Sequence, residues 1–355
     1  MQKSPEPADL HGHLDTPTSL PAEAEAPPSE AETPASEPRA DVASVQSAVG
    51  RVRAELRKLI VGQEALVDLL VATVLAGGHV LIEGVPGIAK TLSAKLLAQT
   101  MDADFARIQF TPDLMPSDVL GTTVFNPKTT EFSFHPGPIF ANLVLIDEIN
   151  RAPAKTQAAL FEVMEERQVS IEGETHPMAP PFHVFATQNP LEHEGTYRLP
   201  EAQLDRFLFK IEVGYPSLDE EVRILDGFQH HGGRLDLGLV EPVWRAEDVT
   251  AAQAEVRNVH VEPNLLRYIA EIVAGTRAHR ALTLGASPRA SLALLTGAKA
   301  FAAMRGRDFV TPEDVRDVTA PVLRHRIMLT PEREMEGVRP DAVIRRIVEG
   351  VEVPR

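Results

Sequence analysis

One short segment holds the residues with the clearest chemistry, a glycine-rich stretch that ends in a lysine and a threonine. In order, its residues are Gly84, Val85, Pro86, Gly87, Ile88, Ala89, Lys90 and Thr91. This spacing is typical of a phosphate-binding loop, which directs backbone N–H groups at phosphate oxygens. In such a loop Lys90 supplies a cation for the β- and γ-phosphates, and Thr91 supplies a hydroxyl for Mg²⁺. The segment therefore predicts that ATP and Mg²⁺ bind here.

The loop also has the neighbours that a phosphate-binding loop requires. Residues 80–82 are an apolar run that predicts a buried strand, and Leu92 and Leu96 lie at helical spacing after the loop. Ala89 occupies the position of the last glycine in the general pattern. We expect it to begin the helix with a negative φ, where a methyl group fits. An ordinary glycine turn is the alternative, and the complete pattern in this context argues against it.

Two carboxylates follow a second apolar run, residues 143–146. The run predicts a strand that ends in Asp147 and Glu148, and ligands of an open parallel sheet gather at the carboxyl ends of its strands. We expect Asp147 to hold Mg²⁺ through its water shell and Glu148 to polarise the attacking water. Two solvated acids at the end of a strand would be the alternative if the loop were absent.

Three more polar residues could complete a catalytic site. Asn189 ends a strand predicted over residues 182–189, where its amide could bridge the water and the γ-phosphate. Arg206 and Arg289 are each candidates for the cation that stabilises charge on the transferred phosphoryl group. Taken singly, an asparagine before a proline is more often a turn residue, and each arginine is more often part of a surface ion pair.

Taken together, these segments resemble the MoxR family of AAA+ ATPases, over about residues 60–326. The shared motifs outside the phosphate loop are Val61–Gln63, Gln109–Leu114, Pro116–Asp118, Gly137–Phe140, Ile146–Ala152, Ala186–Pro190, Glu194–Tyr197, Leu199–Phe207 and Ser287–Ala290. Many ordered matches of this kind are far more specific than a single motif. An alanine at position 89 is usual for the family.

The resemblance also implies roles for individual residues. Asn189 is similar to the first sensor residue, Arg289 to the second sensor on the lid, and Arg206 to the arginine finger that reaches a neighbouring subunit. Arg198 stands where the family pattern has a proline, so it is a rival for the trans-acting cation. The nucleotide-binding residues also include three that precede the loop: Val61, Gly62 and Gln63.

The predicted fold is α/β, an AAA+ P-loop core with a parallel sheet, followed by a small all-helical lid domain. We assign residues 41–214 to the ATPase core and 215–355 to the lid with a C-terminal extension. By resemblance, residues 111–142 are the family's helix-2 insert, expected to form a helix and a hairpin, and 168–181 are its pre-sensor hairpin. Residues 1–40 are acidic, rich in Pro, Ala and Glu, and poor in large apolar residues, which predicts a disordered tail.

Composition excludes several classes of protein. The 355-residue chain has no cysteine, which rules out disulfides and thiolate chemistry. It has no uninterrupted apolar stretch of about 18 residues, so we expect no membrane span and a cytoplasmic protein. The formal net charge of −16 makes broad binding to nucleic acid unfavourable.

The resemblance implies a Mg²⁺-dependent ATPase that forms a homo-oligomeric ring, a hexamer, and remodels protein complexes in a chaperone-like way. It also implies a partner with a von Willebrand factor A domain, for example in the insertion of a metal cofactor into a client enzyme. The alternatives are a DNA-directed motor or transcriptional regulator, a small-molecule phosphotransferase, and a nucleotide-driven binding switch with negligible turnover. The adjacent acids Asp147 and Glu148 favour hydrolysis over phosphotransfer.

Overall fold

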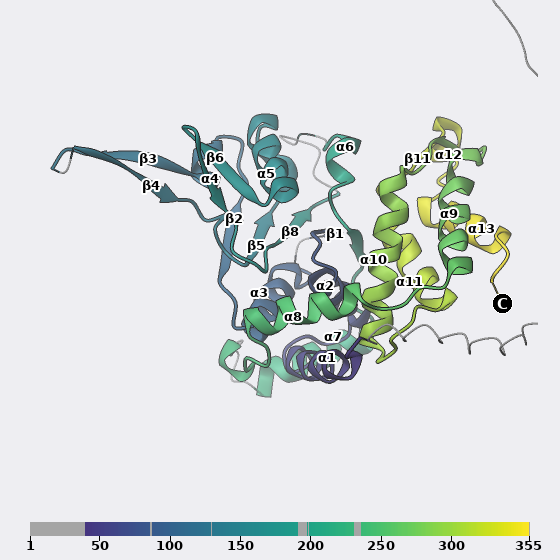
Figure 1. Cartoon of the computed structure of the whole chain (residues 1–355). Helices are drawn as coiled ribbons and strands as arrows, with labels where there is room; N and C mark the ends of the chain where they lie inside the picture. The colour runs from purple at the N-terminus through teal and green to yellow at the C-terminus, as the bar shows by residue number, and fades with distance from the viewer. Residues whose placement is uncertain are drawn as a thin grey trace, which may run out of the picture. The chain divides into compact units, whose positions relative to one another are not determined.

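The computed structural model describes residues 40–354, except 86, 129, 191–196, 198 and 231–235. In this part of the chain, a sheet of five parallel strands has the order β2-β5-β8-β1-β9 (Figure 1). The strands are β1 Val80–Gly84, β2 Phe105–Gln109, β5 Leu143–Asp147, β8 His183–Gln188 and β9 Phe209–Val213. Parallel strands with both faces covered are apolar almost throughout, as β5 is here. The predicted parallel sheet is confirmed.

Side chains alternate between two hydrophobic layers, one on each face of the sheet. Leu143 and Leu145 belong to the cluster that also holds the buried side chains of α1 Val42–Leu56, α2 Glu64–Leu75 and α3 Lys90–Thr100, and α3 packs directly on β5. Val144 and Ile146 pack on the other face, in the cluster that holds the apolar side of helix α5. Helix α5 spans Ala154–Glu166. The short helix η1 Ile149–Arg151 lies between β5 and α5, and the short helix α6 Glu201–Leu204 lies between β8 and β9.

Two hairpins project from the sheet domain (Figure 1). The first contains β3 Gly121–Asn126 and β4 Glu131–Pro136 and follows helix α4 Pro116–Leu120; the second contains β6 Gln168–Ile171 and β7 Glu174–Pro177. The ring of Phe134 stacks on that of His176, with 4.0 Å between centroids, and so joins the two hairpins. The helix and hairpin predicted within 111–142 and the hairpin predicted within 168–181 are confirmed.

The chain beyond residue 214 is mainly helical. Its helices are α7 Leu218–His230, η2 Leu237–Leu239, α8 Ala246–Arg257, α9 Pro263–Ala278, α10 Pro288–Met304, α11 Pro312–Leu323, α12 Pro331–Met335 and α13 Pro340–Gly350. Two short strands, β10 Leu282–Leu284 and β11 Met328–Leu329, form an antiparallel ribbon between them. The sequence predicted neither this ribbon nor helix α8. The two strands of the ribbon are too short to show a periodic pattern. Helix α8 lacks a clear apolar pattern because one of its buried residues is the polar Gln253.

Helices from both sides of residue 214 share one hydrophobic core. Helices α8 and α10 pack against α1 and α2, and Leu294 of α10 is buried in the same cluster as Leu70 of α2. The amide of Gln253 donates to the carbonyl of Val74, with 2.7 Å between nitrogen and oxygen. Apart from Ala40, the predicted tail lies outside the described residues. None of the described helices is long and apolar enough to cross a lipid bilayer.

Two buried histidines lie where the strands begin. His79 Nε2 donates to the Met164 carbonyl at 3.1 Å while its Nδ1 accepts from the Val184 amide, and His183 Nδ1 donates to the Gly78 carbonyl at 2.9 Å. Burial lowers the pKa of His79 to about 3 and that of His183 to about 4. Both side chains are therefore neutral in the folded protein at physiological pH.

We predict that this burial makes stability depend on pH. Between pH 6.5 and 4 the unfolded chain binds protons at both histidines and the folded chain does not, so the free energy of unfolding falls as pH falls. At pH 5 each of His79 and His183 should lower it by about 2 kcal/mol relative to pH 8. Urea unfolding at the two pH values measures the difference. His183→Asn keeps a donor for Gly78 but cannot titrate, so it should show a smaller loss; an unchanged loss would contradict the assignment.

Candidate functional site

One cavity of about 390 Å³ lies at the carboxyl edge of the sheet. Most of the predicted phosphate-loop, metal and water-activating residues line it. Its wall consists of Gly87, Ala89, Lys90, Thr91, Leu92, Arg107, Gln109, Asp147, Glu148, Thr187 and Asn189. Residues from the loop and from the ends of β2, β5 and β8 meet here because parallel strands present all their carboxyl ends at one edge.

The lysine of the loop lies inside the turn. Lys90 Nζ donates to the Gly84 carbonyl and lies 3.5 Å from the Gln188 carbonyl oxygen. Burial lowers the pKa of Lys90, while the negative charges of Asp147 and Glu148 act against this shift. The ammonium group is therefore held by neutral backbone carbonyls, which charged phosphate oxygens can replace.

The turn of the loop differs from our expectation at one residue. Ala89 is not helical: its φ is +61°, in the left-handed region, and the helix begins at Lys90. The prediction of a negative φ was wrong, because the residue directly before a helix need not adopt helical backbone angles. This loop makes a tight turn in which both Gly87, at φ +84°, and Ala89 are left-handed. A left-handed alanine stores backbone strain, as residues at ligand sites often do. Pro86 lies outside the described residues.

Asp147 is buried and surrounded by donors. Its carboxylate accepts from Arg107 Nε at 2.7 Å and from Thr187 Oγ1 at 3.1 Å, and Thr91 Oγ1 lies 3.4 Å from Oδ1. A hydroxyl beside a carboxylate fits Mg²⁺, which takes one or two protein oxygens and completes its shell with water and phosphate. The described residues contain no cluster of three or more His, Asp or Glu that could hold a metal ion.

Glu148 is held in place by neighbours that the sequence did not reveal. Its Oε2 accepts from Gln109 Nε2 at 2.9 Å and pairs with Arg151 Nε at 2.9 Å. Its backbone N–H donates to Thr187 Oγ1 at 3.1 Å, and its φ of +59° is left-handed. Strain of this kind is common where a side chain must point into a functional site.

A pattern in β2 could have identified two of the missed residues. Arg107 and Gln109 alternate with the buried Ile108, so their side chains lie on the same face of a strand that ends at the site. Asn189 follows β8, is buried and lines the same cavity, as expected.

The residues that precede the loop form a second cavity beside it. Val61, Gly62 and Gln63 line this space together with Glu220 and Arg223. Gln63 Nε2 donates to the Ile88 carbonyl at 3.3 Å, which ties this segment to the phosphate loop. Gly62 has a φ of +68°, and a β-carbon there would overlap Glu220. The left-handed φ is what favours a glycine here, because the Glu220 carboxylate is the far end of a flexible side chain and could move aside.

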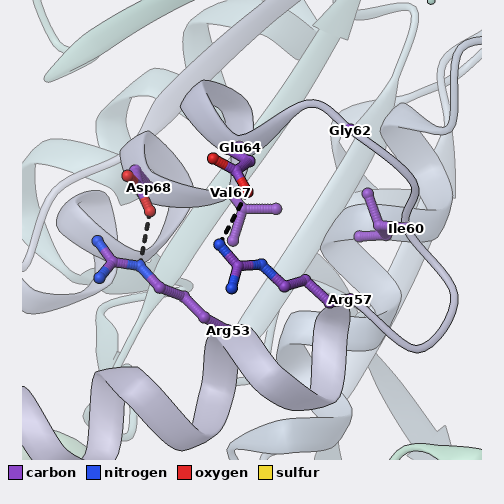
Figure 2. Close-up of a pocket in the computed structure, with 7 residues that line it drawn as sticks. All are labelled: Arg53, Arg57, Ile60, Gly62, Glu64, Val67 and Asp68. Atoms are coloured by element: carbon purple, nitrogen blue, oxygen red, sulfur yellow. Dashed lines mark hydrogen bonds and ion pairs between the residues drawn. The ribbon is translucent and has the colours of Figure 1, made fainter. Parts of the chain in front are cut away.

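Two ion pairs fix the helices on either side of that segment. Arg53 of α1 pairs with Asp68 of α2, and Arg57, the residue after α1, pairs with Glu64 of α2, each with an N–O distance of 2.8 Å (Figure 2). Figure 2 shows Gly62 on the connection between the two helices, above these pairs. The pairs are partly or largely exposed, so they orient α1 and α2 more than they stabilise the fold.

Arg206 and Arg289 do not line the cavity. Arg206 lies just before β9, and Leu208 N–H donates to the carbonyl of His79, the residue before β1. This is the amino edge of the sheet. A five-residue parallel strand spans roughly 15 Å, so Arg206 is separated from its own phosphate loop by about the height of the sheet.

Arg289 joins Arg206 at this edge. Arg206 Nε is 3.1 Å from Glu165 Oε2, and Arg289 Nη2 is 3.0 Å from Glu165 Oε1. Arg289 is the second residue of α10, whereas Glu165 lies in the last turn of α5. The structure thus brings the finger and second-sensor candidates together, away from the cavity of the same chain. Arg198 lies outside the described residues.

A buried ion pair anchors the loop that carries Arg206. Asp205 accepts from Arg326 Nε at 2.6 Å and from Ser287 Oγ at 3.1 Å. Arg326 also donates to the carbonyls of Phe207 and Leu208. The loop before β9 is thereby fixed to the start of α10 and to the end of α11.

Comparison with known proteins gives consistent matches. A model of the ATPase family associated with various cellular activities (AAA) matches residues 79–209, and a model of the AAA lid domain matches 274–347. Chaperone MoxR1 of Mycobacterium tuberculosis is 46% identical over 314 residues, which cover 85% of this chain and 81% of that protein. Protein MoxR of Methylorubrum extorquens is 31% identical, covering 87% and 96%. A crystal structure of a candidate ATPase from Cytophaga hutchinsonii superposes with a TM-score of 0.82 at 40% identity, covering 89% of this chain and 97% of that one.

Proposed function

Because the chain belongs to the MoxR family of AAA+ ATPases, we propose that it hydrolyses ATP and uses the energy to remodel a protein partner. One observation carries the proposal: the cavity at the carboxyl edge brings together Lys90, Thr91, Asp147 and Glu148. Together they provide the cation, hydroxyl and carboxylates that phosphoryl transfer to water needs.

Five residues of the cavity have tasks in this proposal. Lys90 exchanges the Gly84 carbonyl for phosphate oxygens, and Asn189 orients the attacking water. Glu148 accepts a hydrogen bond from that water through Oε1, because the contacts with Gln109 and Arg151 both engage Oε2. Thr91 and Asp147 would hold Mg²⁺, which neutralises charge on the phosphate oxygens.

The transition state also needs a cation on the γ-phosphate, and we propose that a second copy of the chain supplies it. Arg206 and Arg289 lie at the sheet edge opposite their own cavity, so each can serve the nucleotide of a neighbouring subunit. An arrangement in which one edge of each subunit meets the other edge of the next is heterologous, and such an interface forms a ring when the rotation between neighbours closes. A hexamer is the ring size that the family implies.

The partner is proposed from the family. A relative that is 46% identical is named a chaperone, which supports a role in the maturation of protein complexes. We propose a partner with a von Willebrand factor A domain and a client enzyme into which a metal cofactor is inserted. The net charge of −16 counts against a DNA-directed motor.

The variant Glu148→Gln tests hydrolysis. It keeps the size of the side chain and an acceptor for Gln109, but it removes the charge that polarises the water. We expect ATP to bind and turnover to fall at least roughly a hundredfold, as for loss of a positioned base. Steady-state phosphate release and ATP affinity measure the two effects, with Glu162→Gln on the exposed side of α5 as the control. Wild-type turnover by Glu148→Gln would remove this residue from the mechanism.

A further inference from the structure

One carboxylate joins the two arginines that face away from the cavity. Glu165 uses Oε2 for Arg206 and Oε1 for Arg289, so both guanidinium groups lie within 3.1 Å of a single side chain. The three residues come from the sheet domain, the loop before β9 and the helical region. Their separations in sequence are 41 and 124 residues.

Helix α5 contributes a second contact to Arg206. The guanidinium carbon lies 5.9 Å from the centroid of the Phe161 ring, one helical turn before Glu165. The planar group is thus held over a ring face and bonded to a carboxylate, both from one helix. Glu165 binds Arg206 through Nε alone, and the two terminal nitrogens have no hydrogen bond to any described residue. They therefore remain for another anion.

We propose that Glu165 is a positioning residue, which holds Arg206 of the core and Arg289 of the lid as one pair of cations for the neighbouring subunit's γ-phosphate. Two guanidinium groups that bind the same carboxylate lie close together, and they would repel each other without that anion between them. Glu165 supplies that anion before the phosphate arrives. The inference rests on the proposed trans function of the arginines.

The strength of these contacts suits the role. The side chains of Glu165, Arg206 and Arg289 are 36%, 29% and 57% exposed. Ion pairs this exposed are weak, so they orient the arginines without preventing them from binding a phosphate. The same carboxylate also couples the lid to the core. A movement of α10 shifts Arg289, which pulls on Glu165, and Glu165 in turn holds Arg206.

The variant Glu165→Gln tests the proposal. An amide has one acceptor oxygen and a donor that repels the second guanidinium, so the pair should separate. We expect the maximal turnover of the assembled protein to fall roughly tenfold or more, as expected for a misplaced catalytic group. ATP affinity should stay unchanged, because Glu165 lies at the edge opposite its own cavity. Glu166→Gln is the matched control, which removes the same charge from the next residue, also exposed.

A double variant separates positioning from a purely structural effect. If Glu165 acts through Arg289, adding Glu165→Gln to Arg289→Ala should lower turnover by less than it does in the wild-type background. Mixing Glu165→Gln with Lys90→Ala subunits should restore activity, because the second variant presents an intact Arg206, Arg289 and Glu165 to an intact phosphate loop. Full additivity, or no recovery in mixed rings that demonstrably form, would overturn the proposal.

The outcomes for this proposal and for the proposed function differ. Wild-type turnover by Glu165→Gln alongside an inactive Glu148→Gln would refute the positioning role and leave the ATPase function standing. A wild-type chain without ATPase activity would refute the function itself.

Discussion

Replacing Lys90 by alanine should abolish tight ATP binding. The ammonium group lies inside the loop on the Gly84 carbonyl, and in the proposed function it is the loop's own cation for the β- and γ-phosphates. The loop should keep its shape, because its turns at Gly87 and Ala89 are backbone conformations that do not depend on this side chain. Calorimetric titration with ATP and Mg²⁺ measures the loss.

Lys95→Ala provides the control for this experiment. Lys95 is exposed on the same helix, α3, and does not line the cavity. It should bind ATP like the wild type, and thermal unfolding should show that both variants fold. If Lys90→Ala retained the wild-type affinity for ATP with Mg²⁺, the cavity at the carboxyl edge would not be the nucleotide site.

Replacing Arg206 by alanine should lower ATP turnover by roughly a thousandfold or more, in line with other arginines that act in trans. Binding of ATP should persist, because Arg206 lies at the amino edge of the sheet and lines neither the cavity nor the loop. Turnover per subunit in the wild type should rise with protein concentration until the ring is complete. Arg267→Ala, which removes an exposed cation from α9, is the control.

Mixed rings test whether Arg206 acts across the interface. Arg206→Ala keeps an intact phosphate loop, whereas Lys90→Ala keeps an intact arginine edge. Interfaces that combine the two contain both Lys90 and Arg206, so part of the activity should return on mixing. If mixed rings form and remain inactive, Arg206 is not a simple trans-acting finger, and Arg198 should be replaced in the same experiment.

The phosphate loop was predictable because its chemistry is local. Gly87, Lys90 and Thr91 act at fixed short spacings, and a loop between a strand and a helix places backbone N–H groups and the lysine on one side. The acids Asp147 and Glu148 were predictable for a related reason, since they end an apolar strand and strand ends meet at one edge. The hairpin of the insert was predicted because residues 132–134 alternate apolar and polar side chains.

Backbone detail within the loop was less predictable. The left-handed φ of Ala89 was missed because the residue before a helix can adopt helical or non-helical backbone angles. Tertiary packing decides which of them it adopts. Helix α8 was missed because its amide residue Gln253 is buried, where it bonds to Val74 of a helix 179 residues earlier. Propensity and periodicity carry no information about such a partner.

Only the tertiary structure decided how the second half of the site is arranged. The sequence offered Arg206 and Arg289 as separate cations, whereas the fold brings both to Glu165, which has no motif of its own. The contacts of Gln109 with Glu148 and of Arg107 with Asp147 likewise join residues about 40 positions apart. Local spacing determines which groups a loop can present. The contacts of Glu165 with Arg206 and Arg289, which are 41 and 124 residues away in the sequence, depend instead on how the sheet, α5 and α10 pack. This packing determines at which edge of the sheet each charge lies.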